Sequence, residues 1–138
     1  MTMKRLFLAF LVTVISFGLL SAASPLSSSI SGTVAGKTVA GKWWVEDGTS
    51  YIGYIYYTSQ GSKSKLMLQL EWINSSELTL SEYYNGRYTG KFQGTYNSRN
   101  VYSGTYTRAD GRKFSFSLNI SSGALANTYY EFSHPGTF

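Results

Sequence analysis

The sequence has no cysteine, only two prolines and a single histidine among its 138 residues. Without cysteine the chain can form neither a disulfide nor a zinc–thiolate site, and thiol catalysis is excluded. Charged residues are also sparse, at 14% of the chain, and no Gly-rich phosphate loop precedes a helical pattern. The fold must therefore be stabilised by noncovalent burial alone.

The residues best suited to catalysis are scattered. His134 lies beside Pro and Gly near the C-terminus, and Asp47 and Asp110 each precede Gly in predicted turns. Glu71 and Glu77 fall on outward faces of predicted strands. A Ser-His-Asp triad needs an acid that orients the histidine, and a glycosidase needs two carboxylates at a fixed spacing. We therefore predict no catalytic residue, no metal site and no cofactor, and a protein that is not an enzyme.

The N-terminus has the pattern of a secretory signal peptide. Lys4 and Arg5 precede an apolar run from Leu6 to Leu20, and the small residues "SAAS" follow. The alternative is a transmembrane anchor, but the run is short beside the ~20 residues that a span needs. We predict a signal peptide over residues 1–23 and export to the periplasm or the medium.

Charge gives little support for a polyanionic partner. Two of the 12 basic residues lie in the predicted signal peptide, which leaves 10 against seven acidic residues and a net charge of +3. Such a charge is ordinary for solubility, so no nucleic-acid partner is predicted. The remaining 115 residues are enough for one domain with one core.

The chain from residue 30 to about residue 121 has a two-residue hydrophobic period. In "KLMLQLEW" and "RKFSFSLNI" apolar and polar residues alternate, as in strands with one buried face. Turn signals such as Asn85-Gly86 and Asp110-Gly111 separate these runs. The predicted strands are approximately 30–36, 38–46, 51–58, 64–73, 77–84, 87–96, 101–108 and 112–121.

Eight short strands in up-and-down order predict an all-β antiparallel meander that closes into a small barrel, because closure removes exposed strand edges. A two-sheet sandwich is the alternative. Residues 24–29 are predicted to form a flexible lead-in, residues 30–121 the barrel, and residues 122–138 a C-terminal tail. No helical pattern is recognised after residue 30.

Glycine alternates with aromatic residues in "YTGKFQGTY" and "VYSGTY". Gly94 and Gly104 would let their strands bend sharply while neighbouring rings cover them, which a small barrel requires. The repeated Gly-Thr-Tyr is thus interpreted as a curvature device; contact with a ligand is the alternative.

The segments "GYIYY", "LTLSE", "TGKFQGTY", "YSGTY" and "DGRKFSFSL" resemble a group of small exported bacterial β-domain proteins of unknown function. That group has the pattern G-x-Y-x-Y, L-x-L-x-E, G-x-F-x-G, G-T-W and F-x-L. This chain departs from the pattern at Tyr106, where Trp is usual. The resemblance implies an exported β-domain and supplies no activity.

The candidate binding residues are one carboxylate and a set of aromatics. Glu82 follows Leu78 and Leu80 in step, so alternation places it inside the barrel or at its rim, with Tyr88, Tyr102 or Arg87 as hydrogen-bond donors. Alternatively, Glu82 is a solvated strand end. The tentative ligand-binding residues are Glu82, Trp44, Tyr54, Tyr56, Tyr88, Tyr102 and Tyr106.

These residues predict an exported, soluble, non-catalytic binding module for a small apolar or glycan ligand, held at an aromatic-lined barrel mouth or face. The alternative is a protein-interaction module, such as an inhibitor of a secreted enzyme. A filled interior would favour the alternative, and an open mouth lined by Tyr and Trp would favour the ligand. An outer-membrane barrel is a minor alternative.

Overall fold

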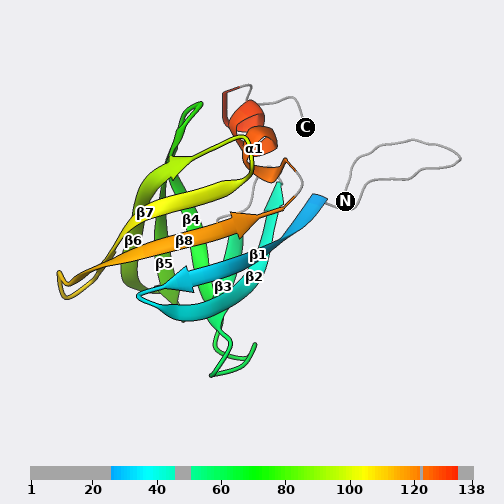
Figure 1. Ribbon diagram of the computed structural model, residues 1–138. Coiled ribbons are helices and arrows are strands. Elements are labelled where there is room, and N and C mark those ends of the chain that lie inside the picture. Colours follow the sequence, from blue (N-terminus) through cyan, green and yellow to red (C-terminus); the bar gives the residue numbers. More distant parts are fainter. Residues whose placement is uncertain (1–25, 46–50, 122, 134–138) are drawn as a thin grey trace, which may run out of the picture.

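The computed structural model describes residues 26–45, 51–121 and 123–133. Its elements in chain order are β1 (Leu26–Val34), β2 (Lys37–Val45), β3 (Gly53–Tyr57), β4 (Leu66–Ile73), β5 (Glu77–Tyr84), β6 (Arg87–Tyr96), β7 (Val101–Arg108), β8 (Lys113–Ile120) and α1 (Ala124–Ser133). Each strand pairs with the next, and β8 pairs antiparallel with β1, so the sheet closes into a barrel (Figure 1). The predicted eight-stranded up-and-down barrel is confirmed.

Alternation along the strands sorts side chains between the interior and the outer face. In β8, Phe116, Leu118 and Ile120 are buried, while Ser117 and Asn119 between them are exposed. The same two-residue period places one face of every strand toward a common core. Hydrophobic patterning therefore determines which side of the sheet becomes the inside of the barrel.

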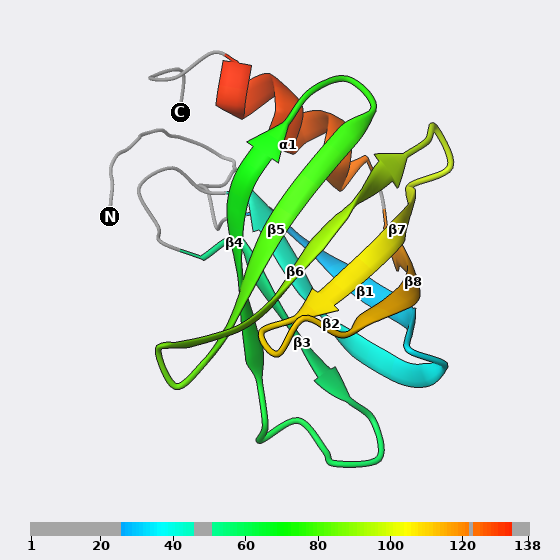
Figure 2. The same ribbon diagram turned by 90° about the vertical axis from the view of Figure 1, so that its left-hand side faces the viewer.

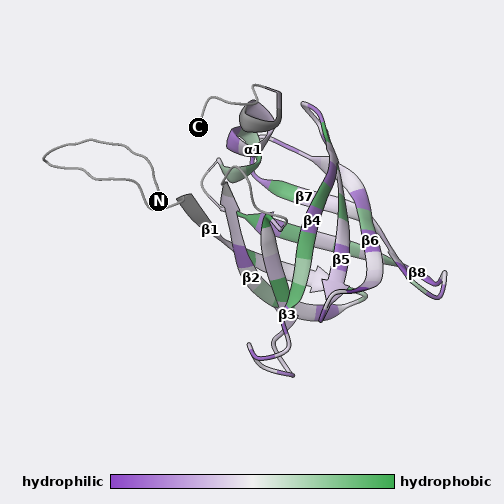
Figure 3. Ribbon diagram, turned by 180° about the vertical axis from the view of Figure 1, so that it is seen from behind, coloured by the Kyte–Doolittle hydropathy of each residue, from purple (hydrophilic) through white to green (hydrophobic). Residues whose placement is uncertain are grey.

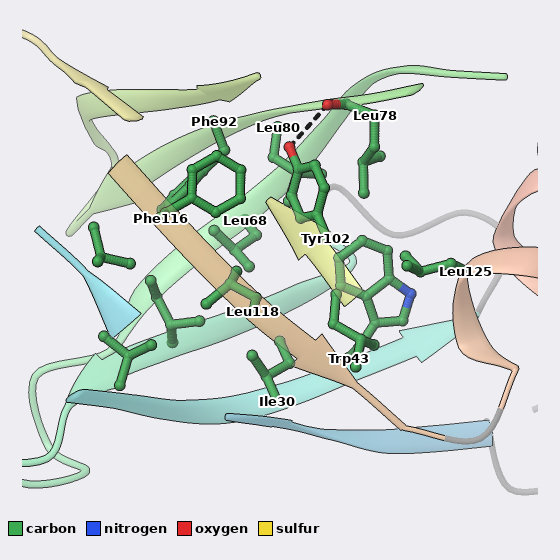
Figure 4. Packing of buried hydrophobic residues seen from close by; sticks show 14 of the residues in the cluster. Ile30, Trp43, Leu68, Leu78, Leu80, Phe92, Tyr102, Phe116, Leu118 and Leu125 are labelled. Atoms are coloured by element: carbon green, nitrogen blue, oxygen red, sulfur yellow. Dashed lines mark hydrogen bonds between the residues drawn. The ribbon is translucent and has the colours of Figure 1, made fainter. Parts of the chain in front are cut away.

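Large side chains fill the middle of the barrel. Trp43, Phe92 and Tyr102 are fully buried, and the Phe116 ring lies 5.0 Å from that of Phe92 and 4.8 Å from that of Tyr102 between centroids (Figure 4). The Tyr102 hydroxyl donates a hydrogen bond to the carbonyl of Leu78 at 2.8 Å. The centre of the barrel is thus a packed core rather than an open channel.

A pair of glycines brings β6 and β7 close together. Gly94 lies directly opposite Gly104, and a Cβ added at either would fall on the carbonyl oxygen of Ser103 or Gln93 in the partner strand. The rings predicted to cover these glycines are not their nearest neighbours, because the nearest atoms are backbone. A ring does cover Gly90, where an added Cβ would meet the Tyr106 side chain.

The predicted start of the barrel is wrong. Residues 26–29 were predicted to be a flexible lead-in, but they belong to β1 and pair with β2 from Leu26↔Val45 to Ser29↔Lys42. Three consecutive serines carry no hydrophobic period, so backbone pairing there gives no sequence signal. The predicted signal peptide, Asp47 and His134 lie outside the described residues.

The prediction of no helix beyond residue 30 is also wrong, because α1 forms within the predicted C-terminal tail. Gly123, at φ 70°, accepts the first helical hydrogen bond from Asn127. Ala124, Leu125 and Thr128 are buried on one face of α1. Thr128 accepts a 2.9 Å hydrogen bond from the Trp43 indole, which attaches the helix to β2. Among the described residues, no helix is long and apolar enough to cross a membrane.

The two ends of the barrel differ. Because successive strands reverse direction, the β1–β2, β3–β4, β5–β6 and β7–β8 turns lie at one end, here called the mouth. The helix α1 follows β8 and so lies at the opposite end (Figure 2). The turns carry hydrophilic residues, and the strands between them carry most of the hydrophobic ones (Figure 3).

Candidate functional site

An open cavity of about 430 Å³ lies at the mouth. Its lining comes from β3 and β4 (Tyr57, Leu66), from β5 and β6 (Glu82, Arg87, Tyr88, Thr89), and from β7 and the turn after it (Tyr106, Arg108, Ala109, Asp110). Binding sites for small molecules have volumes of roughly 300–1,000 Å³, with a few polar groups among apolar walls. The cavity has the size and the mixed lining of such a site.

Glu82 lies in the wall of this cavity and is almost fully buried, with 1% of its surface exposed. Its Oε1 atom accepts hydrogen bonds from the Tyr106 hydroxyl at 2.6 Å and the Thr89 hydroxyl at 2.9 Å. Its Oε2 atom is buried and has no hydrogen-bond partner among the described residues. The carboxyl group therefore keeps one acceptor available beside the cavity.

A β-bulge supplies one of the two donors. Glu82 pairs with Gly90, but Tyr83 pairs with Tyr88, so Thr89 is an extra residue between the two pairs. The hydroxyl of Thr89 also donates to the Glu82 carbonyl at 3.1 Å. Bulges re-aim side chains in this way near functional sites. Thr89 thus contacts Glu82 although simple alternation would point it outward.

The absence of a side chain at Gly90 makes room for the other donor. Tyr106 extends from β7 across β6, over Gly90, to reach Glu82 on β5. A Cβ at Gly90 would lie 2.5 Å from the Tyr106 ring, far inside normal van der Waals contact. The ring is held on its other side by Phe92, with 4.7 Å between centroids. Three strands therefore cooperate to position one carboxyl–phenol pair.

Burial dominates the electrostatics of this group. Burial raises the pKa of Glu82, and the hydrogen bonds from Tyr106 and Thr89 partly oppose the rise by stabilising the carboxylate. Burial also raises the pKa of Tyr106, and the neighbouring Glu82 carboxyl raises it further. Burial and Glu82 likewise raise the pKa of Tyr57, which Arg108 partly offsets. The two phenols therefore remain neutral hydrogen-bond donors across the physiological range.

The rim above Glu82 is mostly cationic. Arg108 donates to Asp110 at 2.8 Å, and Arg112 lies 3.6 Å from the same carboxylate. The backbone N–H of Arg112 is the main cause that lowers the pKa of Asp110, so this carboxylate is ionised at neutral pH. Within the described residues Arg87 forms no ion pair. Neither lining arginine bonds Glu82, so the acceptor and the cations of the mouth stay separate.

The structure brings three of the predicted site residues to the mouth. Glu82, Tyr88 and Tyr106 all line the cavity, and Tyr88 is 41% exposed with its ring 5.9 Å from that of Tyr83. The predicted donors to Glu82 are wrong: Tyr106 and Thr89 bond it instead. Tyr102 was predicted as a ligand-binding residue and a donor to Glu82, but it is fully buried in the core and bonds Leu78.

The other three predicted residues lie on the outer face and away from the mouth cavity. Trp43 and Ile55 point into the core, so their neighbours Trp44, Tyr54 and Tyr56 point outward. The Tyr54 ring lies 6.1 Å from Trp44 and 6.5 Å from Tyr56, and the Lys65 ammonium lies 4.6 Å above it. We call Trp44, Tyr54, Tyr56 and Lys65 the outer aromatic patch.

Sequence reasoning missed Tyr57, Thr89 and Arg108. Tyr57 ends β3 beside the mouth, and its position in the predicted 51–58 strand was the only available signal. Arg108 ends β7 just before the Asp110-Gly111 turn, so the turn prediction was the signal that could have placed it at the rim. Thr89 depends on the bulge, for which the local sequence gives no signal.

No group of three or more potential metal ligands occurs within the described ranges. Comparison with protein-family models, curated proteins and solved structures finds no match to this chain. The function must therefore be inferred from the geometry of the site.

Proposed function

We propose that the protein is an exported, soluble, non-catalytic binding module whose mouth holds one small hydroxylated ligand, such as a unit of a glycan. The observation that carries this proposal is the Oε2 atom of Glu82, a buried acceptor beside an open cavity with no partner among the described residues. A buried polar group without a partner costs about 1–3 kcal/mol, and more if it is charged. A ligand hydroxyl that donates to this atom would remove that cost.

The walls of the cavity suit a sugar ring. Tyr57, Tyr88 and Tyr106 present aromatic surface, and Leu66 adds an apolar contact. Aromatic side chains combine a large contact area with a polar end, which is why they are common in recognition sites. The packed centre of the barrel leaves no long apolar channel, so the apolar-ligand version of the prediction receives less support than the glycan version.

Calorimetric titration of the purified protein with neutral and acidic mono- and disaccharides tests this proposal. We expect at least one of these sugars to bind, and Glu82→Ala and Tyr106→Phe to weaken its binding by about tenfold or more. Glu77→Ala removes an exposed carboxylate at the start of β5, at the end of the barrel opposite the mouth, and is the matched control. Unchanged affinity in Glu82→Ala, or conversion of the sugar into a product, would contradict the proposal.

The outer aromatic patch favours a second candidate function, a protein-interaction module. Its tyrosine and tryptophan rings are partly exposed, and these residue types are enriched in protein contact surfaces. The filled interior of the barrel also favours this alternative. Capture of a secreted enzyme that is abolished by Tyr54→Ser and retained by Glu82→Ala would support it. Retention of that partner by Tyr54→Ser would exclude the patch as the interface.

A further inference from the structure

The mouth separates a hydrogen-bond acceptor from a group of cations. The acceptor, Glu82 Oε2, is buried in the cavity wall, whereas the arginines that line the same cavity are exposed at its rim. No arginine within 4.0 Å neutralises Glu82 in the described part of the chain. A complementary ligand must therefore present a hydrogen-bond donor to Glu82 at its inner end. Its outer end must tolerate, or use, the positive charge of the rim arginines.

The rim carries more positive than negative charge. Arg87 and Arg108 line the cavity at its rim, where Asp110 is the one acidic lining residue besides the buried Glu82, and Arg112 adds a further cation beside Asp110. Asp110 is already engaged by Arg108 and by the backbone of Arg112. Arg87 has no ion pair among the described residues, so its guanidinium is available to a ligand anion. Guanidinium groups bind carboxylates and phosphates through paired, charge-assisted hydrogen bonds.

The ligand group that donates to Glu82 is more suitably a hydroxyl than an ammonium group. Glu82 is 1% exposed, and bringing an ammonium ion to such a depth adds the desolvation of a second charge. A sugar hydroxyl makes the same hydrogen bond without that cost. The tyrosines among the lining residues also suit the flat faces of a sugar ring better than a short charged chain.

We infer that the mouth site selects an acidic sugar, with ring hydroxyls donating to Glu82 and the carboxylate held by Arg87 at the rim. This inference rests on the proposed function, because it assigns a ligand class to the same site. It adds a role for Arg87, which positions and selects the ligand, and it predicts that ligand binding depends on salt concentration.

The test compares sugars that differ in one group. Calorimetric titrations at constant pH use D-galacturonate, D-galactose and D-galactosamine. We expect galacturonate to bind about tenfold tighter than galactose at low salt, since one charge-assisted contact is worth roughly that ratio. Arg87→Gln should reduce the preference severalfold and leave galactose binding unchanged. Arg99→Gln, an exposed arginine in the β6–β7 turn at the other end of the barrel, is the matched control.

The possible results distinguish failure of the acidic-sugar inference from failure of the proposed function. Equal affinity for galacturonate and galactose, both weakened by Glu82→Ala, would overturn the acidic-sugar inference and leave the mouth site standing. Tighter binding of galactosamine would overturn it in favour of an ammonium group at Glu82. Absence of binding by all three sugars, in the folded wild-type protein, would overturn both. A preference for galacturonate that survives Arg87→Gln would overturn the role of Arg87.

Discussion

Glu82 is held in an unusual way for a buried acid. One carboxyl oxygen receives two hydrogen bonds, from Tyr106 and Thr89, while the other has no partner among the described residues. Buried polar groups are nearly always satisfied, so an unsatisfied one in an otherwise apolar barrel indicates a place where stability has been given up. Such local inconsistency is typical of functional sites.

Glu82→Gln should remove a pH-dependent loss of stability. Burial raises the pKa of folded Glu82 above its ordinary value of 4.5. The protonated group therefore contributes stability that is complete below pH 4.5 and is lost as the pH rises through the raised pKa. We expect the variant to be more stable than wild type at pH 8, by about 1–3 kcal/mol, and the two to converge below pH 4.5.

Urea unfolding at a series of pH values measures this difference. Glu77→Gln, which changes an exposed carboxylate at the other end of β5, controls for the general effect of losing one negative charge. If the difference between Glu82→Gln and wild type stays constant with pH, the carboxyl group is not buried as described.

At the scale of single residues, sequence alternation was enough to place Glu82 inside the barrel. It follows Leu78 and Leu80 at two-residue steps, and all three are buried. The partners of Glu82 were not predictable in the same way, because they depend on how β5 and β6 are paired. The bulge at Thr89 shifts that pairing by one residue and so moves Tyr88 away from Glu82.

Among the elements, α1 has the clearest structural role. Its buried face covers the end of the barrel opposite the mouth, where Leu125 packs beside Trp43 (Figure 4). The Trp43 indole is fully buried, so its N–H requires an acceptor, and Thr128 provides it. The helix is thus a part of the core rather than a tail.

Thr128→Val tests that role because valine keeps the shape of threonine and removes the hydroxyl. The Trp43 N–H would then be buried without a partner, and we expect a loss of about 1–3 kcal/mol in unfolding free energy. Asn127→Ala alters the exposed side of the same helix and should change stability by less than about 0.5 kcal/mol or increase it slightly. Equal denaturant midpoints for the two variants would show that the helix is not anchored by this bond.

The pair of glycines between β6 and β7, Gly94 and Gly104, leads to a second prediction about the strands. Gly104→Val would place its Cβ on the Gln93 carbonyl, so the two strands would have to separate. We expect a loss of about 1–3 kcal/mol in unfolding free energy. Lys91→Ala, on the outer side of β6, should change it by less than about 0.5 kcal/mol. A Gly104→Val variant as stable as Lys91→Ala would refute the close approach of the strands.

The elements were predictable where their hydrophobic period was strong. β4 and β8 were found within two residues of their ends, because apolar and polar residues alternate cleanly along them. α1 was missed because its sequence has no acidic residue in its first turn and no basic residue in its last turn. Its Thr-Tyr-Tyr segment also favours strands, and only packing against Trp43 overrides that preference.

At the scale of the whole molecule, closure of the barrel explains both its core and its site. Pairing of β8 with β1 removes both sheet edges, and the up-and-down order places four turns at the mouth. The sequence predicted this architecture because closure is the simplest solution for eight short strands. It could not predict that one end is covered by α1 while the other holds a cavity.

A further prediction for the whole chain is export, and it rests on the N-terminal sequence alone. Cleavage after Ala23 would give a product that begins at Ser24, because "SAAS" places small residues at the cleavage site. The intact mass of the protein recovered from the periplasm or the medium measures this. A membrane-bound product that retains residues 1–23 would contradict export with cleavage.

The most direct measurement of the mouth site is a residue-resolved NMR titration of isotope-labelled protein with D-galactose and D-galacturonate. If the mouth binds these sugars at Glu82, the largest shift changes will fall on Glu82, Thr89 and Tyr106, and with D-galacturonate also on Arg87, and the carboxyl carbon of Glu82 will respond at the same sugar concentrations. Shift changes confined to the outer aromatic patch around Tyr54, or no saturable change at either place, would contradict a ligand site at the mouth.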